Sequence, residues 1–412
     1  MIEGFFDQKQ LTSLSRPDGK VYSCITCGLY KGNKHPRMAP FGNFQKEIMI
    51  IGEAPGEVED ARGKPWQGKT GQLLQRTLKR LGVDLFEDCV SINACHCRPT
   101  DEQGNNRTPT NYEVESCRQE TFKIISRYQP KVILLMGGAA VYSVIGHRWK
   151  RKLGGIGQWR GWCIPDIDLN TWLCPTFHPS YIQRENSGAA EVIWEQDLSQ
   201  AIRKITDTLP EYIDPVVMYL DDLSVLDSLN TAESRVVSID YETTGLKPHA
   251  PGHRIVCASV GIDANHAYVF MLPESKRARQ PFIRLLQNTS IGKMAHNMKF
   301  EESWSRDRLK VSVDRWVWDS MLAAHLLDNR PGVTGLKFQT YVNFGVVDYS
   351  SEIDPFLTST DQKGANATNR ILELISSSGG REKLLKYCGL DSVYEYRLAM
   401  IQRKLIENQL PF

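Results

Sequence analysis

The sequence has no apolar run long enough to cross a bilayer, which requires about 20 consecutive residues. Its beginning, Met1-Ile2-Glu3-Gly4-Phe5-Phe6-Asp7, lacks the basic-then-apolar pattern of a secretory signal peptide. These absences argue against a membrane-spanning class and against a secreted one. We therefore expect a soluble, cytoplasmic protein that makes no contact with a membrane.

A large net charge is also missing. The chain has 50 Lys and Arg residues against 48 Asp and Glu residues, which gives a formal net charge of +2. Proteins that coat nucleic acid indiscriminately are usually more basic than this. We expect any contact with nucleic acid to be local, at grooves or loops, with acidic metal sites offsetting basic patches.

The 412 residues are enough for two or more domains. In the first half, runs typical of buried strands alternate with stretches of helical periodicity. The strand-like runs are 46–52, 90–94, 131–136 and 172–177, and the helical stretches are 71–82, 112–127 and 138–145. Residues 188–207 resemble a closing amphipathic helix. This alternation predicts a layered α/β domain with a largely parallel sheet.

A second pattern begins after Pro210 and Pro215. Its three strand-like runs are 235–241, 253–262 and 266–272, and helical segments dominate from about residue 298 onward. This order indicates a separate, mixed α/β domain. We place the boundary near 208–214, which gives domains 1–209 and 210–412. The stretch 349–363, rich in Ser and Asp, is expected to be a solvated loop.

Four of the ten cysteines are spaced as metal ligands could be. Cys24 and Cys27 form a CxxC pair, and Cys97 and Cys117 follow downstream. Soft thiolates select zinc or an iron–sulfur cluster, and a CxxC pair alone fits a redox motif or a zinc site equally well. Cys95 lies two residues from Cys97, so spacing alone does not decide between them. The remaining cysteines lie in apolar surroundings typical of small core residues.

Five motifs surround these cysteines in order, and each alone would be read as a turn or a helix start. They are Gly52-Glu53-Ala54-Pro55-Gly56-Glu57-Val58-Glu59-Asp60, Gly63-Lys64-Pro65-Trp66-Gln67-Gly68-Lys69-Thr70-Gly71, Asn93-Ala94-Cys95-His96-Cys97-Arg98-Pro99, Asn106-Arg107-Thr108-Pro109-Thr110 and His178-Pro179-Ser180. Together they resemble the iron–sulfur uracil-DNA glycosylases, often called family four, over roughly residues 20–205. The resemblance implies a three-layer glycosylase fold with a parallel sheet. It also implies a [4Fe-4S] cluster of structural role, on Cys24, Cys27, Cys97 and Cys117.

The same resemblance assigns roles around a base extruded from the DNA stack. Asn93 would recognise uracil by its side-chain amide, and Trp66, where the family usually has Phe, would stack on the base. His178 would hydrogen-bond the O2 atom and stabilise the departing uracilate. Glu53 would position or activate the attacking water, and Glu59 would support the substrate-binding loop.

The second half contains dispersed carboxylates. Asp240 and Glu242 end a strand-like run and point to the same face, because side chains alternate along a strand. Two acids on one face are costly unless a cation neutralises them, and hard carboxylates suit Mg²⁺ or Mn²⁺. Ala295-His296-Asn297-Met298-Lys299-Phe300-Glu301 follows another strand-like run. Tyr387 and Asp391 share a helical face through their spacing of four.

This series resembles the 3′–5′ exonucleases with four dispersed acids, in the subtype with Tyr in the third motif. The proofreading domains of family A DNA polymerases and the RNase D-like enzymes belong there, and the resemblance covers roughly residues 230–405. It implies a ribonuclease-H-like fold in which two Mg²⁺ or Mn²⁺ ions are held by Asp240, Glu242, Glu301 and Asp391. Glu301 stands where the family normally has Asp. Tyr387 would orient the attacking water, and Asn297 would contact the substrate.

The leading hypothesis is a bifunctional enzyme of a bacterium or of a phage-infected host. One half would excise uracil from DNA, and the other would degrade DNA from 3′ ends, as in proofreading. A separate DNA polymerase is a candidate partner, since no polymerase motif is present in the sequence. Two alternatives remain. The glycosylase-like half could serve only to bind DNA or uracil, or the exonuclease-like half could trim RNA as RNase D does, which a uracil-recognising partner argues against.

Overall fold

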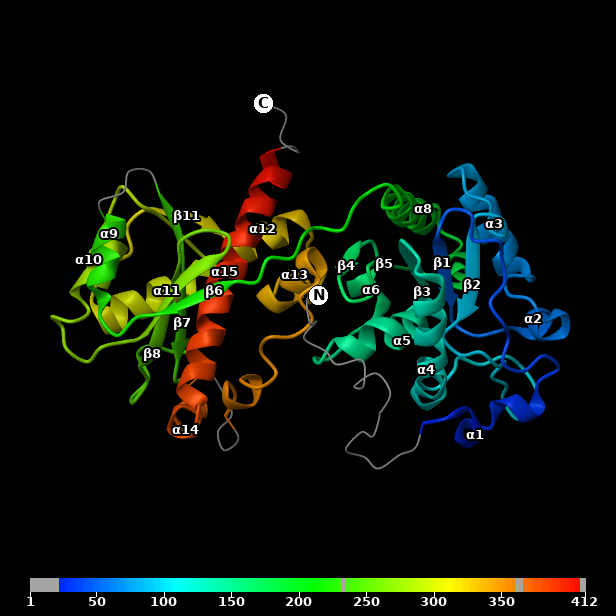
Figure 1. Cartoon of the computed structure of the whole chain (residues 1–412), viewed down its shortest axis with the longest axis horizontal. Coiled ribbons are helices and arrows are strands. Elements are labelled where there is room, and N and C mark those ends of the chain that lie inside the picture. The colour runs from blue at the N-terminus through cyan, green and yellow to red at the C-terminus, as the bar shows by residue number, and fades with distance from the viewer. Residues whose placement is uncertain (1–21, 231–234, 360–365, 408–412) are drawn as a thin grey trace. The chain divides into compact units, whose positions relative to one another are not determined.

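The computed structural model describes residues 22–230, 235–359 and 366–407. Contacts divide these residues into two compact units (Figure 1). The first runs to Glu211 and includes Val342–Val347, and the second comprises the rest from Tyr212 onward. The beginning of the chain and positions 360–363 of the predicted solvated loop lie outside the described residues. Within the described ranges, no helix combines the length and apolar character needed to cross a membrane.

The first unit contains a five-stranded sheet within the residues that the structure describes, in the order β2-β1-β3-β5-β4. Its strands are β1 (Ile48–Gly52), β2 (Cys89–Asn93), β3 (Val132–Met136), β4 (Ile164–Asp166) and β5 (Thr171–Thr176). All neighbours pair in parallel except β4 and β5, which are antiparallel. The helices are α1 (Cys24–Cys27), α2 (Glu57–Arg62), α3 (Lys69–Arg80), α4 (Asn111–Tyr128), α5 (Gly138–Arg148), α6 (Ile156–Trp159), α7 (Pro179–Glu185) and α8 (Gly188–Arg203).

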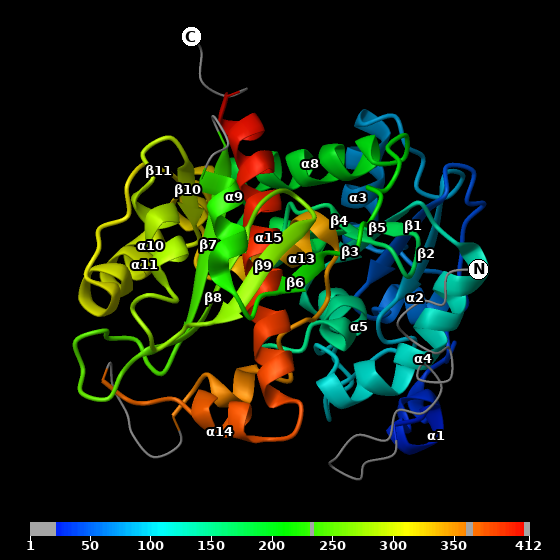
Figure 2. The same cartoon turned by 60° about the vertical axis from the view of Figure 1, so that its left-hand side comes forward.

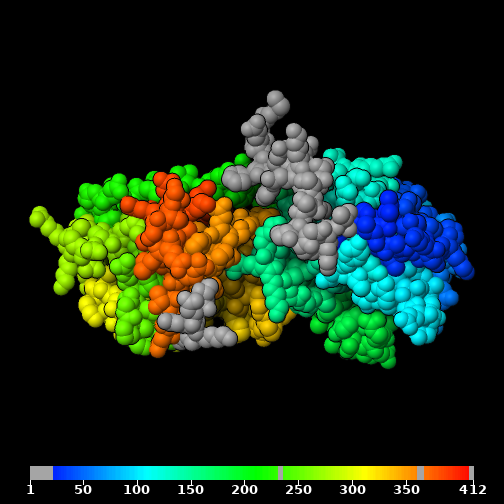
Figure 3. All heavy atoms as spheres, turned by 90° about the horizontal axis from the view of Figure 1, so that it is seen from below, coloured from blue at the N-terminus to red at the C-terminus, as the bar shows by residue number. Residues whose placement is uncertain are grey.

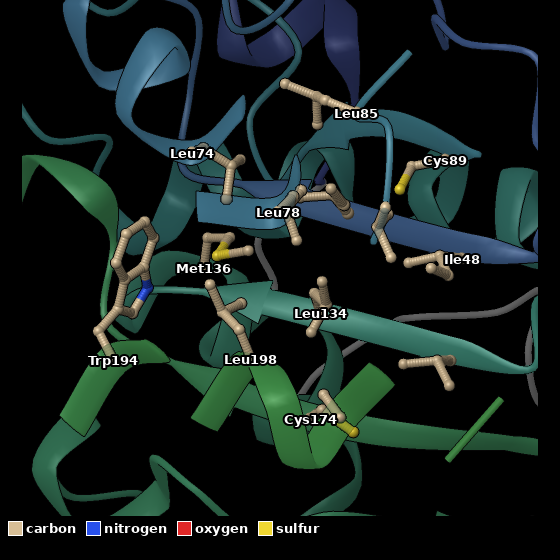
Figure 4. Close-up of a cluster of buried hydrophobic side chains, with 14 of the residues drawn as sticks. Ile48, Leu74, Leu78, Leu85, Cys89, Leu134, Met136, Cys174, Trp194 and Leu198 are labelled. Carbon is tan, nitrogen blue, oxygen red and sulfur yellow. The ribbon is translucent and has the colours of Figure 1, made fainter. Parts of the chain in front are cut away.

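Helices cover both faces of this sheet, which makes three layers. Strand alternation sends Ile48 and Leu134 into a core that also includes Leu74 and Leu78 of α3 and Trp194 of α8 (Figure 4). Helices α4 and α5 pack together, and α5 contacts β1 and β3. All residues of β1, β2 and β3 are buried, as expected for a parallel sheet covered on both faces.

The four predicted strands of this half are confirmed as β1, β2, β3 and β5, and the three internal helices as α3, α4 and α5. The predicted closing helix exists as α8, but it ends at Arg203 and not at residue 207. The sequence did not predict β4, because three residues are too few to show a periodicity.

The second unit contains a six-stranded mixed sheet among the described residues, in the order β11-β10-β7-β8-β9-β6. Its strands are β6 (Val216–Tyr219), β7 (Val236–Thr243), β8 (Ile255–Gly261), β9 (His266–Met271), β10 (Gly292–Ala295) and β11 (Trp316–Asp319). The helices are α9 (Leu226–Asn230), α10 (Gln280–Gln287), α11 (Met298–Trp304), α12 (Ser320–Leu327), α13 (Leu336–Phe344), α14 (Ile371–Ser376) and α15 (Gly380–Glu407). The central β7, β8 and β9 are antiparallel, and parallel strands flank them.

Helix α15 runs across β7, β8 and β9 (Figure 2). Two buried serine hydroxyls fix it there: Ser238 Oγ donates to the carbonyl of Ser392 over 2.6 Å, and Ser259 Oγ donates to that of Cys388 over 2.8 Å. Phe282, with the rest of α10, packs on the opposite face in a core with Val237 of β7. Alternate residues of β7 therefore face α15 and α10.

The sequence predicted three strands here, and the structure corrects this number. The predicted runs correspond to β7, β8 and β9, and the run before residue 296 is β10. The two that were missed, β6 and β11, have four residues each, and β6 has no fully buried position. The described part of the predicted 349–363 loop holds a short 3₁₀ helix, η5 (Asp354–Phe356), and is otherwise irregular.

Leu134→Ala tests the core of the first unit. Leu134 is 1% exposed in the middle of β3, so we expect the substitution to lower the free energy of unfolding of this unit by about 2–5 kcal/mol. Chemical denaturation followed by tryptophan fluorescence measures this change. Val192→Ala on α8 is the control, because Val192 is 56% exposed and its truncation should change stability by less than about 0.5 kcal/mol. Equal midpoints for the two variants would contradict the assignment of this core.

Candidate functional site

In the first unit, polar residues meet where β1 and β2 end. The two strands pair in parallel with Gly52 opposite Asn93, so Glu53, the next residue, and Asn93 lie at the same edge of the sheet. A Cβ on Gly52 would overlap with Asn93 Oδ1 and lie 3.0 Å from Trp66 Cζ2. Glycine is therefore required at position 52 for Asn93 and Trp66 to approach this strand end.

Trp66 lies in the loop between α2 and α3. It is 6% exposed, its φ of +59° is in the left-handed region, and its Nε1 atom is buried without a hydrogen-bond partner. Glu59 of α2 holds this loop, because Glu59 Oε1 accepts the backbone N–H groups of Gln67 and Gly68, each at 3.0 Å. The structure therefore places Glu59 as a support of the Trp66 loop.

His178 follows β5 and caps the N-terminus of α7. Its Nδ1 atom accepts the backbone N–H of Ser180 at 3.2 Å, so the ring proton is carried by Nε2. Burial, reinforced by the charge of Arg184, lowers the pKa of His178 to about 4. The ring centroid lies 5.6 Å from that of Trp66. His178 is therefore a neutral hydrogen-bond donor beside Trp66.

Glu53 has two neighbours that the sequence analysis missed. Burial raises the pKa of Glu53, while a hydrogen bond from the Thr108 hydroxyl and the charge of Arg184 oppose this rise. Thr108 belongs to the fourth motif of the series, in which Arg107 donates to Glu113 and thereby supports the start of α4. Thr108 had no role assigned within its motif, and nothing in a single sequence distinguishes Arg184 from an ordinary helix residue.

The side chains around β1, β2 and β5 can thus act together on one planar, polar molecule. Trp66 offers an aromatic face, Asn93 an amide with both donor and acceptor atoms, and His178 a neutral N–H donor. Glu53 offers a carboxylate at the same edge of the sheet as Asn93. This set suits recognition of a base together with activation of water.

Cys24, Cys27, Cys97 and Cys117 gather from α1, the loop after β2, and α4. Helix α1 begins with a capping box between Ser23 and Thr26, and residues around it form part of the surface (dark blue in Figure 3). Burial raises the pKa of Cys97 to about 11, and Cys117, Cys24 and Cys27 add to this effect. The structure therefore brings the four predicted ligands close enough to interact electrostatically.

The sulfur atoms have the surroundings of metal-bound thiolates. Arg37 donates its backbone N–H to Cys97 Sγ at 3.2 Å and its Nε–H to Cys24 Sγ at 3.1 Å. In the described part of the chain, no three of the cysteine sulfurs lie within 4.8 Å of one another. Four thiolates form a donor set that fits an iron–sulfur cluster.

Cys95, the alternative ligand, is differently placed. Its thiol interacts with Cys117 and donates to the carbonyl of Cys97 over 3.4 Å, and the side chain is fully buried. Cys97, in contrast, receives the N–H of Arg37 and interacts with all three other predicted ligands. These contacts favour Cys97.

In the second unit, Asp240 and Glu242 of β7 point toward α15. Their carboxylates and the Cys388 thiol lie within 4.8 Å of one another, and they form the one such group of metal-ligating atoms among the described residues. Burial, followed by the charge of Asp391, raises the pKa of Asp240 to about 7. Burial and Asp240 also raise the pKa of Glu242. Such mutual repulsion is what bound cations relieve.

Glu301 and Asn297 are placed by α11. Asn297 starts this helix with a φ of +76°, and Glu301 lies in its first turn with 3% of its surface exposed. Asp319 holds the helix start, because its carboxylate accepts the N–H groups of Asn297 and Met298 at 3.1 and 3.0 Å. Burial raises the pKa of Glu301, and Asp240 contributes next. Glu301 therefore faces the same cluster as Asp240.

Asp391 and Tyr387 lie one turn apart on α15, and both are buried. Two residues without an assigned role bind this pair. Tyr349 donates its hydroxyl to Asp391 Oδ1 at 2.6 Å, and Lys337 pairs with the same carboxylate. The Lys337 ammonium also lies 4.3 Å from the centroid of the Tyr387 ring. No sequence motif pointed to Tyr349, which lies in the stretch predicted to be a solvated loop.

Comparison with known proteins identifies both halves. A model of the uracil DNA glycosylase superfamily matches residues 39–202, and a model of 3′–5′ exonucleases matches residues 221–407. The type-4 uracil-DNA glycosylase of Pyrobaculum aerophilum is 34% identical over 184 residues, which are 43% of this chain and 88% of that protein. The chain belongs to the type-4 uracil-DNA glycosylase family.

This type-4 glycosylase family member is an enzyme with a second, 3′–5′ exonuclease domain. A DNA polymerase of Bacillus phage SP01 is 23% identical over 320 residues, covering 70% of this chain and 33% of that protein. Because that stretch is longer than either family match, it includes parts of both halves. Among solved structures, Brucella melitensis NrnC is 19% identical over 47% of this chain and 83% of that chain, with a TM-score of 0.32.

The family matches agree with the two folds. The first unit is an α/β glycosylase domain with a largely parallel sheet, and the second is a ribonuclease-H-like α/β domain. Together they make a bifunctional enzyme of nucleic-acid repair and degradation, for which DNA is the implied substrate.

Proposed function

We propose that this protein excises uracil from DNA in its first unit and removes nucleotides from the 3′ end of DNA in its second. The observation that carries the proposal is the convergence of two separate sets of side chains. Glu53, Trp66, Asn93 and His178 converge at one strand edge, and the buried carboxylates converge between β7 and α15.

In the first unit, Trp66 would stack on a flipped uracil while the Asn93 amide pairs with its N3 and O4 atoms. His178 would donate Nε2–H to the O2 atom, where negative charge develops as the glycosidic bond breaks. The bonding electrons leave with uracil, and water bonds to the sugar C1′ atom. Glu53 would accept the proton of that water. A neutral His178 can perform this task, because its Nε2–H donates a hydrogen bond to the developing anion although the lowered pKa leaves the ring uncharged.

We further propose that Cys24, Cys27, Cys97 and Cys117 hold a [4Fe-4S] cluster. The cluster would supply a structural crosslink between α1, α4 and the strand end that carries Asn93, since cleavage of a glycosidic bond needs no redox step. Arg37 would stabilise the negatively charged thiolates through the hydrogen bonds that it makes to Cys97 and Cys24.

In the second unit, Asp240, Glu242, Glu301 and Asp391 would hold two Mg²⁺ or Mn²⁺ ions. When bound, such ions supply Lewis-acid chemistry that activates water and stabilises the departing 3′ oxygen. Tyr387 would orient the water, and Tyr349 would keep the Asp391 carboxylate in place. Asn297, at the start of α11, would contact the terminal nucleotide. We also propose that a separate DNA polymerase is the partner whose errors this unit removes.

Two substitutions separate the proposed activities. We expect Glu53→Ala to abolish uracil release while 3′ degradation continues, because Glu53 belongs to the first unit alone. Asp240→Ala should have the opposite effect. Uracil release and 3′ degradation are both measured on DNA oligonucleotides with and without uracil, and RNA of the same sequence serves for comparison. If the wild-type protein produced no abasic sites, the first unit would be a binding module and not a glycosylase. Faster trimming of RNA than of DNA would refute the assigned substrate of the second unit.

Thr108→Val tests the protonation of Glu53. The carboxylate acts only when it is ionised, and the Thr108 hydrogen bond lowers a pKa that burial raises. Removing the hydroxyl should raise this pKa further, so that uracil excision is lost at a higher pH on acidification than in the wild-type protein. Rates of uracil excision measured from pH 4 to pH 8 locate the acid limb, the pH range in which activity falls on acidification. Arg184→Gln should also shift this limb to higher pH. If neither variant shifts the acid limb, protonation of Glu53 is not its cause.

Cys97→Ser and Cys95→Ser form a matched pair for the cluster. We expect Cys97→Ser to lose bound iron and visible absorption, because it removes a proposed ligand, whereas Cys95→Ser should retain both. Iron and zinc contents of the purified protein, with the absorption spectrum, provide the measurement. Zinc in place of iron in the wild-type protein, or loss of iron only in Cys95→Ser, would contradict the assignment.

A further inference from the structure

Cys388 lies among the carboxylates of the second unit and has no role in the proposed reaction. Its Sγ atom lies close to one carboxylate oxygen each of Asp240 and Glu242, and the three atoms are all within 4.8 Å of one another. Cys388 belongs to α15, directly follows Tyr387 and is fully buried. The sulfur therefore lies beside β7, from which the two carboxylates project.

Hydrogen bonds hold Cys388 in this position. Its backbone carbonyl accepts the hydroxyl of Ser259 on β8 over 2.8 Å. Its thiol donates to the backbone carbonyl of Asp240 over a long separation of 3.8 Å. A thiol is a weak donor, so this contact can be given up at little cost. The backbone thus places the sulfur beside β7, and no strong bond occupies the sulfur itself.

The neighbouring carboxylates lack protein partners. Glu242 is 8% exposed, and within the ranges that the structure describes no group donates a hydrogen bond to its carboxylate. The Oδ2 atom of Asp240 is buried and also has no hydrogen-bond partner. Buried carboxylate oxygens of this kind are costly unless a ligand compensates for the lost water. These oxygens and the Cys388 sulfur therefore form a compact set of atoms that can bind a cation.

Cys257 shows what a structural thiol looks like in the same region. It is fully buried, and it lies directly opposite Glu242 where β7 pairs with β8. Among the described residues, its sulfur does not join the group of Asp240, Glu242 and Cys388. Burial beside an acid therefore does not by itself bring a sulfur to both carboxylates, and the position of Cys388 on α15 does.

A sulfur among carboxylates changes which ions a site prefers. Mg²⁺ and Mn²⁺ favour oxygen ligands, whereas thiolates favour softer ions such as Zn²⁺. Zinc accepts cysteine and carboxylate ligands together, with bonds of about 2.3 Å to sulfur and about 2.0–2.2 Å to oxygen. Three protein ligands would leave the fourth position of such an ion to water. The donor set therefore suits a thiophilic ion as well as a hard one.

We propose that Cys388, Asp240 and Glu242 form a site for a thiophilic divalent cation of the zinc type, which competes with Mg²⁺ or Mn²⁺ for the two carboxylates. The thiol releases its proton to solvent as the metal–sulfur bond forms. The inference rests on the proposed exonuclease function, because it uses two of the same carboxylates, and it adds a competing ion to that function.

Absorption spectroscopy with Cd²⁺ as the thiophilic probe tests for the metal–sulfur bond, because Cd²⁺ bound to a thiolate has an ultraviolet charge-transfer band. We expect Cd²⁺ to produce such a band in the full chain, in excess of that in Asp240→Asn, and Cys388→Ser and Cys388→Ala to lose this excess. Cys257→Ser is the matched control, since it removes an equally buried thiol and should retain the band. Absence of the excess band from the wild-type protein, its retention in both Cys388 variants, or its loss only in Cys257→Ser would overturn the inference.

Calorimetric titration with Mn²⁺ and with Cd²⁺ separates this inference from the proposed function. Cys388→Ser should still bind Mn²⁺, which prefers oxygen, and this binding also shows that the variant is folded. Its affinity for Cd²⁺ should fall by about 10- to 100-fold, the range seen when a partner of a metal site is removed. If Mn²⁺ binding required Asp240 but Cd²⁺ affinity did not depend on Cys388, the inference would fail and the exonuclease site would stand. If the wild-type protein and Asp240→Asn bound Mn²⁺ alike, the proposed exonuclease site itself would fail, and the inference with it.

Discussion

A buried strand has its backbone N–H and C=O groups paired with its neighbours, and this constraint governs where both units can hold polar side chains. A side chain projects away from this pairing, so a polar group can be presented from a strand, or just beyond its end, while the backbone is satisfied. Glu53 follows β1, and its carbonyl accepts the N–H of Cys95, while Asn93 is the last residue of the adjacent β2. Asp240 and Glu242 lie within β7, opposite Ser259 and Cys257 of β8. In both units the chemistry therefore lies on or beside a hydrogen-bonded strand.

The two sites differ in how they compensate for burial. In the first, apart from Trp66 Nε1, the polar groups described are bound by protein: Ser180 binds His178, Thr108 binds Glu53, and backbone amides bind Glu59. In the second, carboxylate oxygens face one another and several have no protein partner. A protein can keep such a cluster only if its protons or its bound cations remove the repulsion. The first site thus satisfies these groups within the protein, whereas the second leaves a repulsion that the proposed cations would relieve.

Much of this organisation could be predicted from the sequence. The resemblance of its contiguous motifs to two enzyme families singled out Glu53, His178 and Asp240, and the structure places each of them in a candidate site. The short strands β4, β6 and β11 were missed, since three or four residues give no periodicity. Tyr349 was missed for another reason: its approach to Asp391 depends on tertiary packing, and it lies in no recognisable motif.

The serine hydroxyls of β7 and β8 have a consequence for the choice of ion. They bind carbonyls of α15 at positions 388 and 392, one turn apart, so the helix can neither slide along the sheet nor rotate on it. Asp391 and Asp240 are short side chains on these two fixed elements, and their separation is therefore set by the backbone. The glutamates at 242 and 301 each have an additional rotatable bond. In the proposed metal site, adjustment to cations of different radius would then come from glutamate torsions, with the aspartates as its less variable part.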